Sequence, residues 1–372
     1  MSVRREVPYV NLVKQHAALK EELLEAVARV IDHGQFILGP EVALFEQAVA
    51  ARVGVPHAVA VNSGTDALIM ALRVLNIGPG DEVITASNSF VASASAIALV
   101  GATPVLVDVE EGYNLDPRQL AGALTSRTRA ILPVHLTGRP AELGPLLDFA
   151  TQHGLQVIED CAQAIDAQYG GKAVGSFGTL GAFSLHPLKT LNACGDGGII
   201  TLHDAELDAR LRVMRNIGLR SRECCEFWSG NSRLDTMQAA ILLVKLKYLD
   251  EWTEKRRKNA HFYREALRDL PQVQVPDEPA HMRCVYHTFV VQVERREALQ
   301  AALQAAGIGT AIHYPNPVHV QPCAASLSLR PGQLPVTERQ ASRILSLPIY
   351  PELSVDNLSY VVEQMRHFYQ AG

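Results

Sequence analysis

The chain has 372 residues, 48% of them hydrophobic, which is enough to bury one large core and a smaller second one. Its formal net charge of -5 and sequence pI near 6.2 exclude a strong positive field, so neither nucleic acid nor a membrane surface is an expected partner. The first residues, MSVRREVPYVNL, lack the apolar core of a signal peptide, so we expect a cytoplasmic protein.

Two amphipathic helices are predicted before the first strand, at Gln15 to His33 and at Pro40 to Arg52. Each is followed by a glycine, Gly34 and Gly54, the residue that most readily ends a helix. We expect these helices to cap the domain or to form part of a dimer contact.

From His57 onward, apolar runs alternate with helical patterns, which indicates an α/β domain with a mostly parallel sheet flanked by helices. Residues 83–107 carry no charged side chain, a length that would suit a membrane span. Asn88, several serines and threonines, Gly101 and Pro104 interrupt this stretch. A strand, a helix and a second strand are therefore the better prediction.

The last third of the chain predicts a smaller α+β domain. Leu234 to Leu270 has a long helical pattern, with room for a break, that would bridge two domains. After it, HTFVVQV, REALQAALQAAG and IGTAIHY predict a strand, a helix and a strand. We place the boundary near Leu249, which gives a large domain of residues 1–249 and a small domain of residues 250–372. Residues 317–336, rich in proline and serine, are expected to form an ordered loop over a cleft.

The cysteines suit neither a zinc site nor a disulfide framework, because none of them form a CxxC pair. We expect reduced thiols, and we place Cys224 and Cys225 in a polar loop. The six are Cys161, Cys194, Cys224, Cys225, Cys284 and Cys323.

Asp160 and Lys189 carry the most chemical information. Asp160 follows the apolar run Gln156 to Ile158, and Lys189 follows Gly181 to Leu185 and precedes a glycine-rich turn. The carboxyl ends of parallel strands share one edge of a sheet, so both side chains are expected to meet in one pocket. Pyridoxal phosphate needs an amine that holds its aldehyde as a Schiff base and a carboxylate beside its pyridinium nitrogen. Taken alone, Lys189 would be a surface charge, and Asp160 a helix cap or half of an ion pair.

The turn from Asn62 to Thr65 lies between a predicted strand and a predicted helix. Free backbone N–H groups and the helix dipole favour a phosphate at such a turn. An ordinary serine or threonine helix cap explains the same pattern.

Eight segments resemble, in order, the sugar aminotransferases of the DegT/DnrJ/EryC1/StrS family, which are fold type I pyridoxal phosphate enzymes. The resemblance covers nearly the whole chain, and it implies this fold and this cofactor. The segments are NSGTDAL at 62–68, GDEVIT at 80–85, GATPVLVDV at 101–109, EDCAQA at 159–164, FSLHPLK at 183–189, GDGG at 195–198, NSRLD at 231–235 and HYPNPVHVQP at 313–322.

The resemblance implies that Lys189 is the catalytic Schiff-base lysine and that Asp160 contacts the pyridinium nitrogen. In one branch of the family a histidine replaces this lysine, and those proteins are sugar dehydratases. Lys189 argues against that branch, because a free amine can carry a proton between the substrate carbon and the cofactor carbon. We assign no role to His186.

The resemblance also implies the other cofactor contacts. Gly64, Thr65 and Ser184 would bind the phosphate, and Gln163 would lie near the phenolic oxygen. Phe90 would cover the face of the pyridoxal ring, with a place in the hydrophobic core as the alternative.

Asn231 and Arg233 match a family segment that reaches into the neighbouring subunit's site, with Asn231 near that site's phosphate. The resemblance therefore implies a homodimer with shared active sites. Asn231 would equally suit the N-cap of the helix that follows. Gly230 stands where the family has an aromatic residue, which puts the substrate contacts of this loop in doubt.

His313, Tyr314, His319 and Gln321 match the small-domain loop that faces the sugar nucleotide in the family. The two histidines have no acidic or cysteine partner in the sequence around them, so we expect no metal site.

The resemblance implies an aminotransferase that moves an amino group from glutamate to a keto sugar carried by a nucleotide. The segments at 231–235 and 313–322 favour a 3-keto-6-deoxyhexose. A 4-keto sugar, a keto-uronic acid and a keto-cyclitol are alternative acceptors. A pyridoxal phosphate-binding regulator without turnover is the alternative of a different class.

Overall fold

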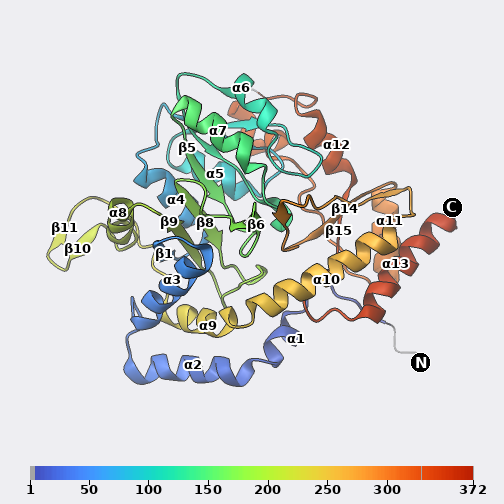
Figure 1. Cartoon of the computed structure of the whole chain (residues 1–372), viewed down its shortest axis with the longest axis horizontal. Helices are drawn as coiled ribbons and strands as arrows, with labels where there is room; N and C mark the ends of the chain where they lie inside the picture. The colour runs from blue at the N-terminus through green and yellow to red at the C-terminus, as the bar shows by residue number, and fades with distance from the viewer. Residues whose placement is uncertain (1–4, 328, 372) are drawn as a thin grey trace.

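The computed structural model describes residues 5–327 and 329–371, and a seven-stranded sheet forms the centre of the larger part (Figure 1). The strand order is β1-β9-β8-β5-β4-β2-β3. The strands from β8 to β3 are parallel, and β9 runs antiparallel to both of its neighbours. The mostly parallel sheet predicted from the sequence is therefore confirmed. The strands are β1 (His57–Val61), β2 (Glu82–Ala86), β3 (Thr103–Val107), β4 (Thr128–Leu132), β5 (Gln156–Asp160), β8 (Leu180–Ser184) and β9 (Gly198–Leu202).

Alternate residues of each central strand point to opposite faces, and helices cover both faces. Val59 and Val61 of β1 pack in one apolar cluster, whereas Ala58 and Ala60 pack in another. Because both faces are buried, the strands have nearly continuous apolar sequences. The flanking helices are α3 (Pro40–Val53), α4 (Gly64–Val74), α5 (Val91–Leu99), α6 (Leu120–Ala123), α7 (Leu143–His153) and α8 (Ala205–Arg215).

The uncharged stretch of residues 83–107 forms β2, α5 and β3, as the sequence predicts. Within the described residues, no helix has both the length and the apolar character needed to cross a membrane.

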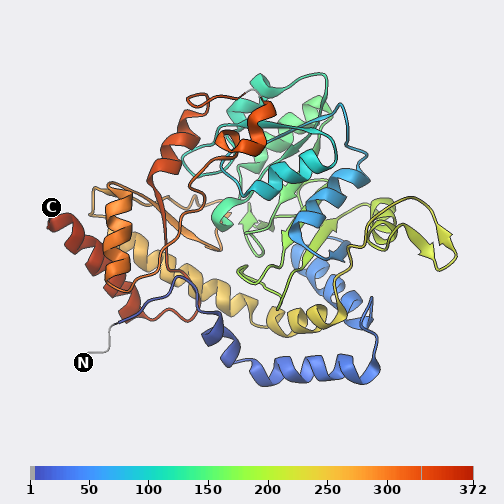
Figure 2. The same cartoon turned by 180° about the vertical axis from the view of Figure 1, so that it is seen from behind.

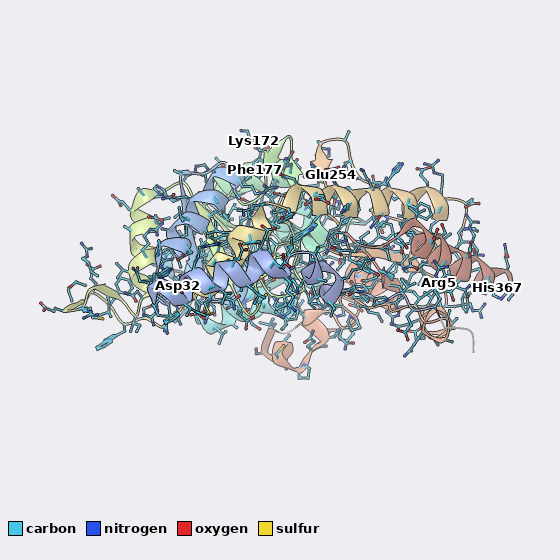
Figure 3. All side chains as sticks on the ribbon, turned by 90° about the horizontal axis from the view of Figure 1, so that it is seen from below. Arg5, Asp32, Lys172, Phe177, Glu254 and His367 are labelled. Carbon is cyan, nitrogen blue, oxygen red and sulfur yellow. The ribbon has the colours of Figure 1, made fainter. Side chains whose placement is uncertain are left out.

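The amino-terminal helices extend along one side of the molecule. The pattern that predicts one helix at Gln15 to His33 forms two, α1 (Leu12–Ala17) and α2 (Lys20–His33). Gly34 and Gly54 end α2 and α3 in the left-handed conformation, with φ of 69° and 82°. α2 packs on α9 (Thr236–Leu246) and lies across the face that Figure 3 shows, with Asp32 near one end.

A second core lies toward the carboxyl-terminal end. It packs around a sheet of order β12-β14-β15, formed by β12 (Val273–Gln274), β14 (Phe289–Val293) and β15 (Ile344–Leu347). The helices α10 (Leu249–Leu267), α11 (Arg296–Ala305) and α13 (Val355–Gln370) cover it, and α12 (Pro335–Arg343) lies between the two parts. Val7 packs in the same cluster, so an amino-terminal residue completes this core.

The strand predicted at IGTAIHY is wrong. Ile308 forms only an isolated bridge with Val7, and Ala311 forms one with Ser346. The reason is that β15 occupies the sheet position beside β14. Residues 308–314 therefore cross the edge of β15 and do not pair along this strand.

Several short elements complete the chain. β10 (Leu219–Ser221) and β11 (Cys224–Cys225) form a hairpin that projects from the body in both views, so the polar loop expected around Cys224 is instead a strand (Figures 1 and 2). The others are β6 (Gln168–Tyr169), β7 (Lys172–Ala173), β13 (Met282–Arg283), and the 3-10 helices η1 (Pro117–Gln119), η2 (Leu136–Gly138), η3 (Val318–Val320) and η4 (Pro322–Leu327).

Candidate active site

A cavity of about 330 Å³ lies where the carboxyl ends of the parallel strands meet the smaller core. Nine of the residues predicted from the sequence line it: Gly64, Thr65, Phe90, Asp160, Gln163, Ser184, Lys189, His313 and Tyr314.

Asp160 is the last residue of β5, and its carboxylate is buried beside the cavity. One oxygen accepts a hydrogen bond from Ser93 Oγ at 2.8 Å, and the other accepts one from Ala162 N at 3.1 Å. Burial raises the pKa of Asp160 above its ordinary value, and the Lys189 charge opposes this rise. No described residue forms an ion pair with Asp160, so a cation in the cavity would stabilise its charged form.

Lys189 follows β8 and is held by a backbone hydrogen bond from its N–H to His186 O at 2.8 Å. Burial lowers the pKa of Lys189 from its ordinary 10.5 to about 8, although the Asp160 charge acts in the opposite direction. At pH 7, a lysine with a pKa of about 8 has about one tenth of its amine neutral, far more than at its ordinary pKa, and the neutral amine is the nucleophile of Schiff-base chemistry.

The amino terminus of α4 packs against β8 and β9 closely enough to require glycine. A Cβ on Gly64 would lie 2.5 Å from Ser184 Cβ, and one on Gly198 would lie 2.3 Å from Ser63 O. Ser63 caps α4 by accepting a hydrogen bond from Asp66 N at 3.1 Å, so the helix-cap interpretation holds for this serine. The N–H groups of Gly64 and Thr65 precede the first intrahelical hydrogen bond and are available to a phosphate.

Two aromatic rings and an amide lie on another side of the cavity. Phe90 is 53% exposed, so the alternative that it belongs to the core is wrong. Its ring centroid is 5.5 Å from that of Tyr314. Gln163 donates from Nε2 to Tyr314 Oη at 3.2 Å and accepts at Oε1 from Thr137 N at 2.7 Å. Gln163 therefore links the large part to the loop that carries Tyr314.

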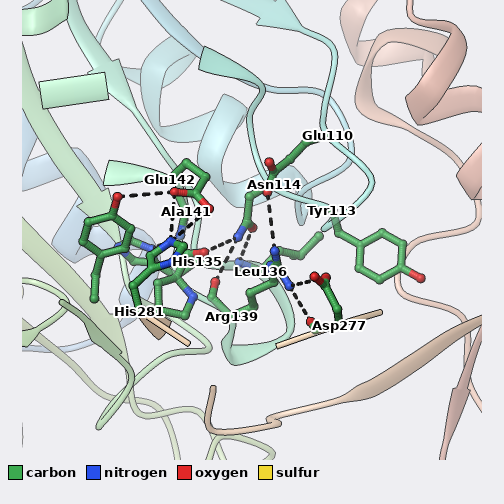
Figure 4. Close-up of polar contacts among 12 residues, drawn as sticks. Glu110, Tyr113, Asn114, His135, Leu136, Arg139, Ala141, Glu142, Asp277 and His281 are labelled. Carbon is green, nitrogen blue, oxygen red and sulfur yellow. Dashed lines mark hydrogen bonds and ion pairs between the residues drawn. The ribbon is translucent and has the colours of Figure 1, made fainter. Parts of the chain in front are cut away.

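Asn114 fixes the loop that carries Leu136 and Arg139, as Figure 4 shows. Asn114 Oδ1 accepts from Leu136 N at 3.0 Å, and Nδ2 donates to Arg139 O at 3.0 Å and to Pro140 O at 2.8 Å. Leu136 directly precedes Thr137, so these bonds also hold the N–H of Thr137 in place, and this N–H orients Gln163.

His135, Glu159 and Cys161 are the one group of described residues close enough together to suggest a metal site. His135 Nδ1 accepts a hydrogen bond from Ala141 N, so Nε2 carries the proton and donates to Glu159 Oε2 at 3.1 Å. Glu159 also accepts three backbone N–H bonds. The ring keeps no lone pair for a metal, and the group is a structural network.

Four predicted residues, Asn231, Arg233, His319 and Gln321, lie away from the cavity of a single chain. Arg233 donates from Nη1 to Asn216 Oδ1 at 3.0 Å. Asn231 is exposed and forms a bridge with Asn216, and Asp235 precedes α9, so the alternative N-cap role of Asn231 is wrong. His319 is buried, with Nδ1 2.7 Å from Ser87 Oγ and Nε2 3.2 Å from Glu338 Oε1. Both ring nitrogens of His319 are therefore occupied. Gln321 donates to Asn316 O at 2.9 Å.

Sequence patterns alone missed several cavity residues. Ser93 lies one helical turn after Phe90, and this spacing could have indicated that both side chains face the same cavity. The others come together only through long-range packing and have no local signal. They include Tyr9, Arg256, His287 and Thr288.

Pyridoxal phosphate fits these residues. The turn at Gly64, which packs closely on Ser184 and which we call the glycine cradle, suits the phosphate of the cofactor. The buried carboxylate of Asp160 suits its pyridinium nitrogen, and the amine of Lys189, with its lowered pKa, suits its aldehyde.

Comparisons with known proteins agree with this chemistry. A family model described as the DegT/DnrJ/EryC1/StrS aminotransferase family matches residues 17–366. A dTDP-3-amino-3,4,6-trideoxy-alpha-D-glucose transaminase of Streptomyces venezuelae is 44% identical over 99% of this chain and 98% of its own length. A Geobacillus stearothermophilus protein named pleiotropic regulatory protein is also 44% identical, over 98% of this chain and 99% of its own length. The crystal structure of S. venezuelae DesV in complex with a ketimine intermediate superimposes with a TM-score of 0.95 at 44% identity, covering 98% of both chains.

Proposed function

Since this chain belongs to the DegT/DnrJ/EryC1/StrS aminotransferase family, we propose that it transfers an amino group from glutamate to a nucleotide-linked keto sugar, with pyridoxal phosphate as cofactor. The observation that carries this proposal is the presence of Asp160 and Lys189, each with a perturbed pKa, on one cavity. Conversion of glutamate to 2-oxoglutarate, dependent on added keto sugar, tests it.

Each residue has a separate task in this mechanism. Bound pyridoxal phosphate supplies an electron sink that stabilises negative charge at the reacting carbon. Lys189 Nζ would take the proton from the amino-bearing carbon of the donor and deliver it to the aldehyde carbon of the cofactor, which its pKa of about 8 permits near neutral pH. Asp160, fixed by Ser93 and Ala162, holds a proton on the ring nitrogen. Phe90 and Tyr314, whose ring centroids are 5.5 Å apart, give the cavity an apolar side on which the cofactor ring would pack.

The acceptor that we propose is a 3-keto-6-deoxyhexose on a nucleoside diphosphate. The similarity to a 3-amino sugar transaminase supports position 3. His313 and Tyr314 line the cavity and would contact the sugar. A panel of nucleotide-linked 3-keto and 4-keto sugars, keto-uronic acids and keto-cyclitols tests this choice, and a preference for a 4-keto sugar would contradict it.

A regulator that binds the cofactor without turnover is the second candidate, because a relative of equal identity is named a regulatory protein. The similarity at the same identity to a named transaminase favours the enzyme instead. Loss of the visible absorption band of the bound cofactor on addition of glutamate would support the enzyme, and an unchanged band would support the regulator.

We also propose a homodimer with shared active sites. Exposed apolar side chains at Phe36, Ile37, Leu38 and Leu44 support a partner surface near α3. Asn231 lies outside its own chain's cavity, as a residue that serves the partner's site would. All six cysteines are free, which supports a cytoplasmic location, where thiols remain reduced.

Complementation tests the shared site. If each site takes Lys189 from one chain and Asn231 from the other, inactive Lys189→Ala and Asn231→Asp subunits form mixed dimers in which one site carries both lesions and the other carries none. Random re-association makes about half of the dimers mixed, so activity should recover to about a quarter of the parent value. Confirmed subunit exchange without recovery would contradict the shared site.

A further inference from the structure

The side of the cavity formed by the smaller part carries three buried polar atoms that have no hydrogen-bond partner among the described residues. They are Arg256 Nε, His287 Nδ1 and Thr288 Oγ1. All three residues line the cavity that also contains Lys189. Unpaired buried polar atoms destabilise a fold, so a cluster of them on a cavity wall indicates a bound group that completes their hydrogen bonds.

The protein forms hydrogen bonds with one nitrogen of the Arg256 guanidinium, Nη1, and leaves another, Nε, without a partner among the described residues. Its Nη1 donates to Ile349 O at 2.6 Å and lies 3.3 Å from Tyr286 O and 3.4 Å from His287 O. These bonds fix the plane of the guanidinium and leave Nε without a partner. A guanidinium held in one plane is prepared for a planar acceptor such as a carboxylate.

The charge of Arg256 is not neutralised within the described part of the chain. Burial lowers its pKa to about 10, so it remains a cation at neutral pH. Glu352 is the acidic group that influences it most, but the two form no ion pair, and Glu352 Oε2 is itself without a hydrogen-bond partner. A buried cation without a paired anion favours the entry of an anionic ligand.

The neighbouring groups are polar and uncharged. Burial, together with the charges of Lys189 and Arg256, holds the pKa of His287 well below its ordinary value, so its imidazole is neutral. Thr288 adds a hydroxyl donor. Lys189, the other cation of this cavity, is assigned to the cofactor, so Arg256 with the neutral side chains of His287 and Thr288 suits a single carboxylate better than a doubly charged phosphate.

We propose that Arg256, with His287 and Thr288, binds the carboxylate of the amino donor. This inference rests on the proposed aminotransferase function and assigns the donor its own subsite. A donor amino acid carries a carboxylate on the same carbon as its amino group, so the carboxylate must lie near Lys189. The phosphates of a nucleotide-linked keto sugar are separated from the keto carbon by the sugar ring, and the cofactor phosphate has its cradle at Gly64.

The test measures the two half-reactions of the holoenzyme separately, by the change in cofactor absorbance. Arg256→Gln is expected to raise the apparent Kd for glutamate by about 30-fold or more, because it removes a charge-assisted hydrogen bond. The apparent Kd of the amino form for the keto sugar should change by less than about twofold, because the residues proposed to contact the sugar, His313 and Tyr314, do not include Arg256. Arg257→Gln is the matched control, because this neighbouring arginine pairs with Glu278 and does not line the cavity.

Thr288→Val provides an independent variant that does not disturb the anchor of Arg256. Because its hydroxyl has no partner in the protein, replacing it with a methyl group should leave the melting temperature unchanged or higher. Glutamate binding should nevertheless weaken by about 10-fold or more, the size of one hydrogen bond to a charged group. A purely structural role for Thr288 would not combine these two results.

The outcomes separate the two proposals. If the parent protein does not react with glutamate, the proposed function fails. If the parent reacts, but a folded Arg256→Gln variant binds glutamate as tightly as the parent does, the carboxylate subsite is wrong. If Arg256→Gln does not fold, Thr288→Val decides, and unchanged glutamate binding in that variant overturns the inference. A loss of sugar binding instead of glutamate binding would also overturn it.

Discussion

Replacing Lys189 with methionine should stabilise the cofactor-free protein while destroying its activity. Methionine has a similar length and no charge, so it can occupy the same space on the cavity wall without the cost of burying an ammonium group. Active sites commonly hold such unfavourable groups because the chemistry needs them.

The magnitude follows from the pKa of Lys189. Lowering this pKa from 10.5 to about 8 means that burial disfavours the charged form by about 3 kcal/mol at most. Solvent in the cavity reduces this value, so we expect Lys189→Met to raise the free energy of unfolding by about 1–3 kcal/mol at pH 7.

The sign of the pH dependence is fixed by linkage. Below pH 8 Lys189 is mostly charged in both the folded and the unfolded protein, and the folded protein is destabilised by the full free energy of burying this charge. Between pH 8 and pH 10.5 the unfolded state binds more protons, so the stability of the parent rises with pH. The advantage of Lys189→Met should therefore shrink by about 1 kcal/mol between pH 7 and pH 9.

Urea unfolding of the cofactor-free parent and variant at pH 7 and pH 9 measures these differences. A variant that is less stable than the parent at pH 7 would refute the reasoning. An advantage that stays constant or grows from pH 7 to pH 9 would refute it as well.

Three further substitutions test individual contacts. Lys189→Ala should abolish turnover but retain much of the cofactor affinity, because the contacts at Gly64 and Ser184 remain; near-parent conversion of glutamate would contradict this. Asp160→Asn should bind cofactor yet lose at least about tenfold in rate, equal to about 1.4 kcal/mol of barrier, and a smaller loss would count against its role at the ring nitrogen. Gly64→Ala should lower stability by about 1–3 kcal/mol and weaken cofactor binding because its Cβ would collide with Ser184, whereas Gly122→Ala, where space is open, should not; equal melting temperatures would show that the close approach is unimportant.

The parts of the site that the sequence predicts well depend on local patterns. Asp160 ends one short buried strand and Lys189 follows another, and the direction of a parallel strand determines at which edge of the sheet its carboxyl end lies. The cradle at Gly64 follows a strand and opens a helix, so its position is also set locally. A family motif then assigns each of these residues a role.

The parts that could not be predicted depend on long-range packing. Arg256 lies in the middle of a charged helix, and only the fold brings it to the cavity wall beside His287. His319 has the motif of a substrate residue, but Ser87 and Glu338, far away in sequence, occupy both of its ring nitrogens. The failed strand at 308–314 has the same cause, since β15 takes its place beside β14.

The most direct test of the proposed function is a single-turnover experiment on the holoenzyme in two steps. Glutamate alone should remove the visible band of the bound cofactor and release one equivalent of 2-oxoglutarate per site. A nucleotide-linked 3-keto-6-deoxyhexose, added after removal of glutamate, should restore the band and form one equivalent of amino sugar. A band that does not respond to glutamate, or that no nucleotide-linked keto sugar restores, would contradict the assignment of this protein as a keto-sugar aminotransferase.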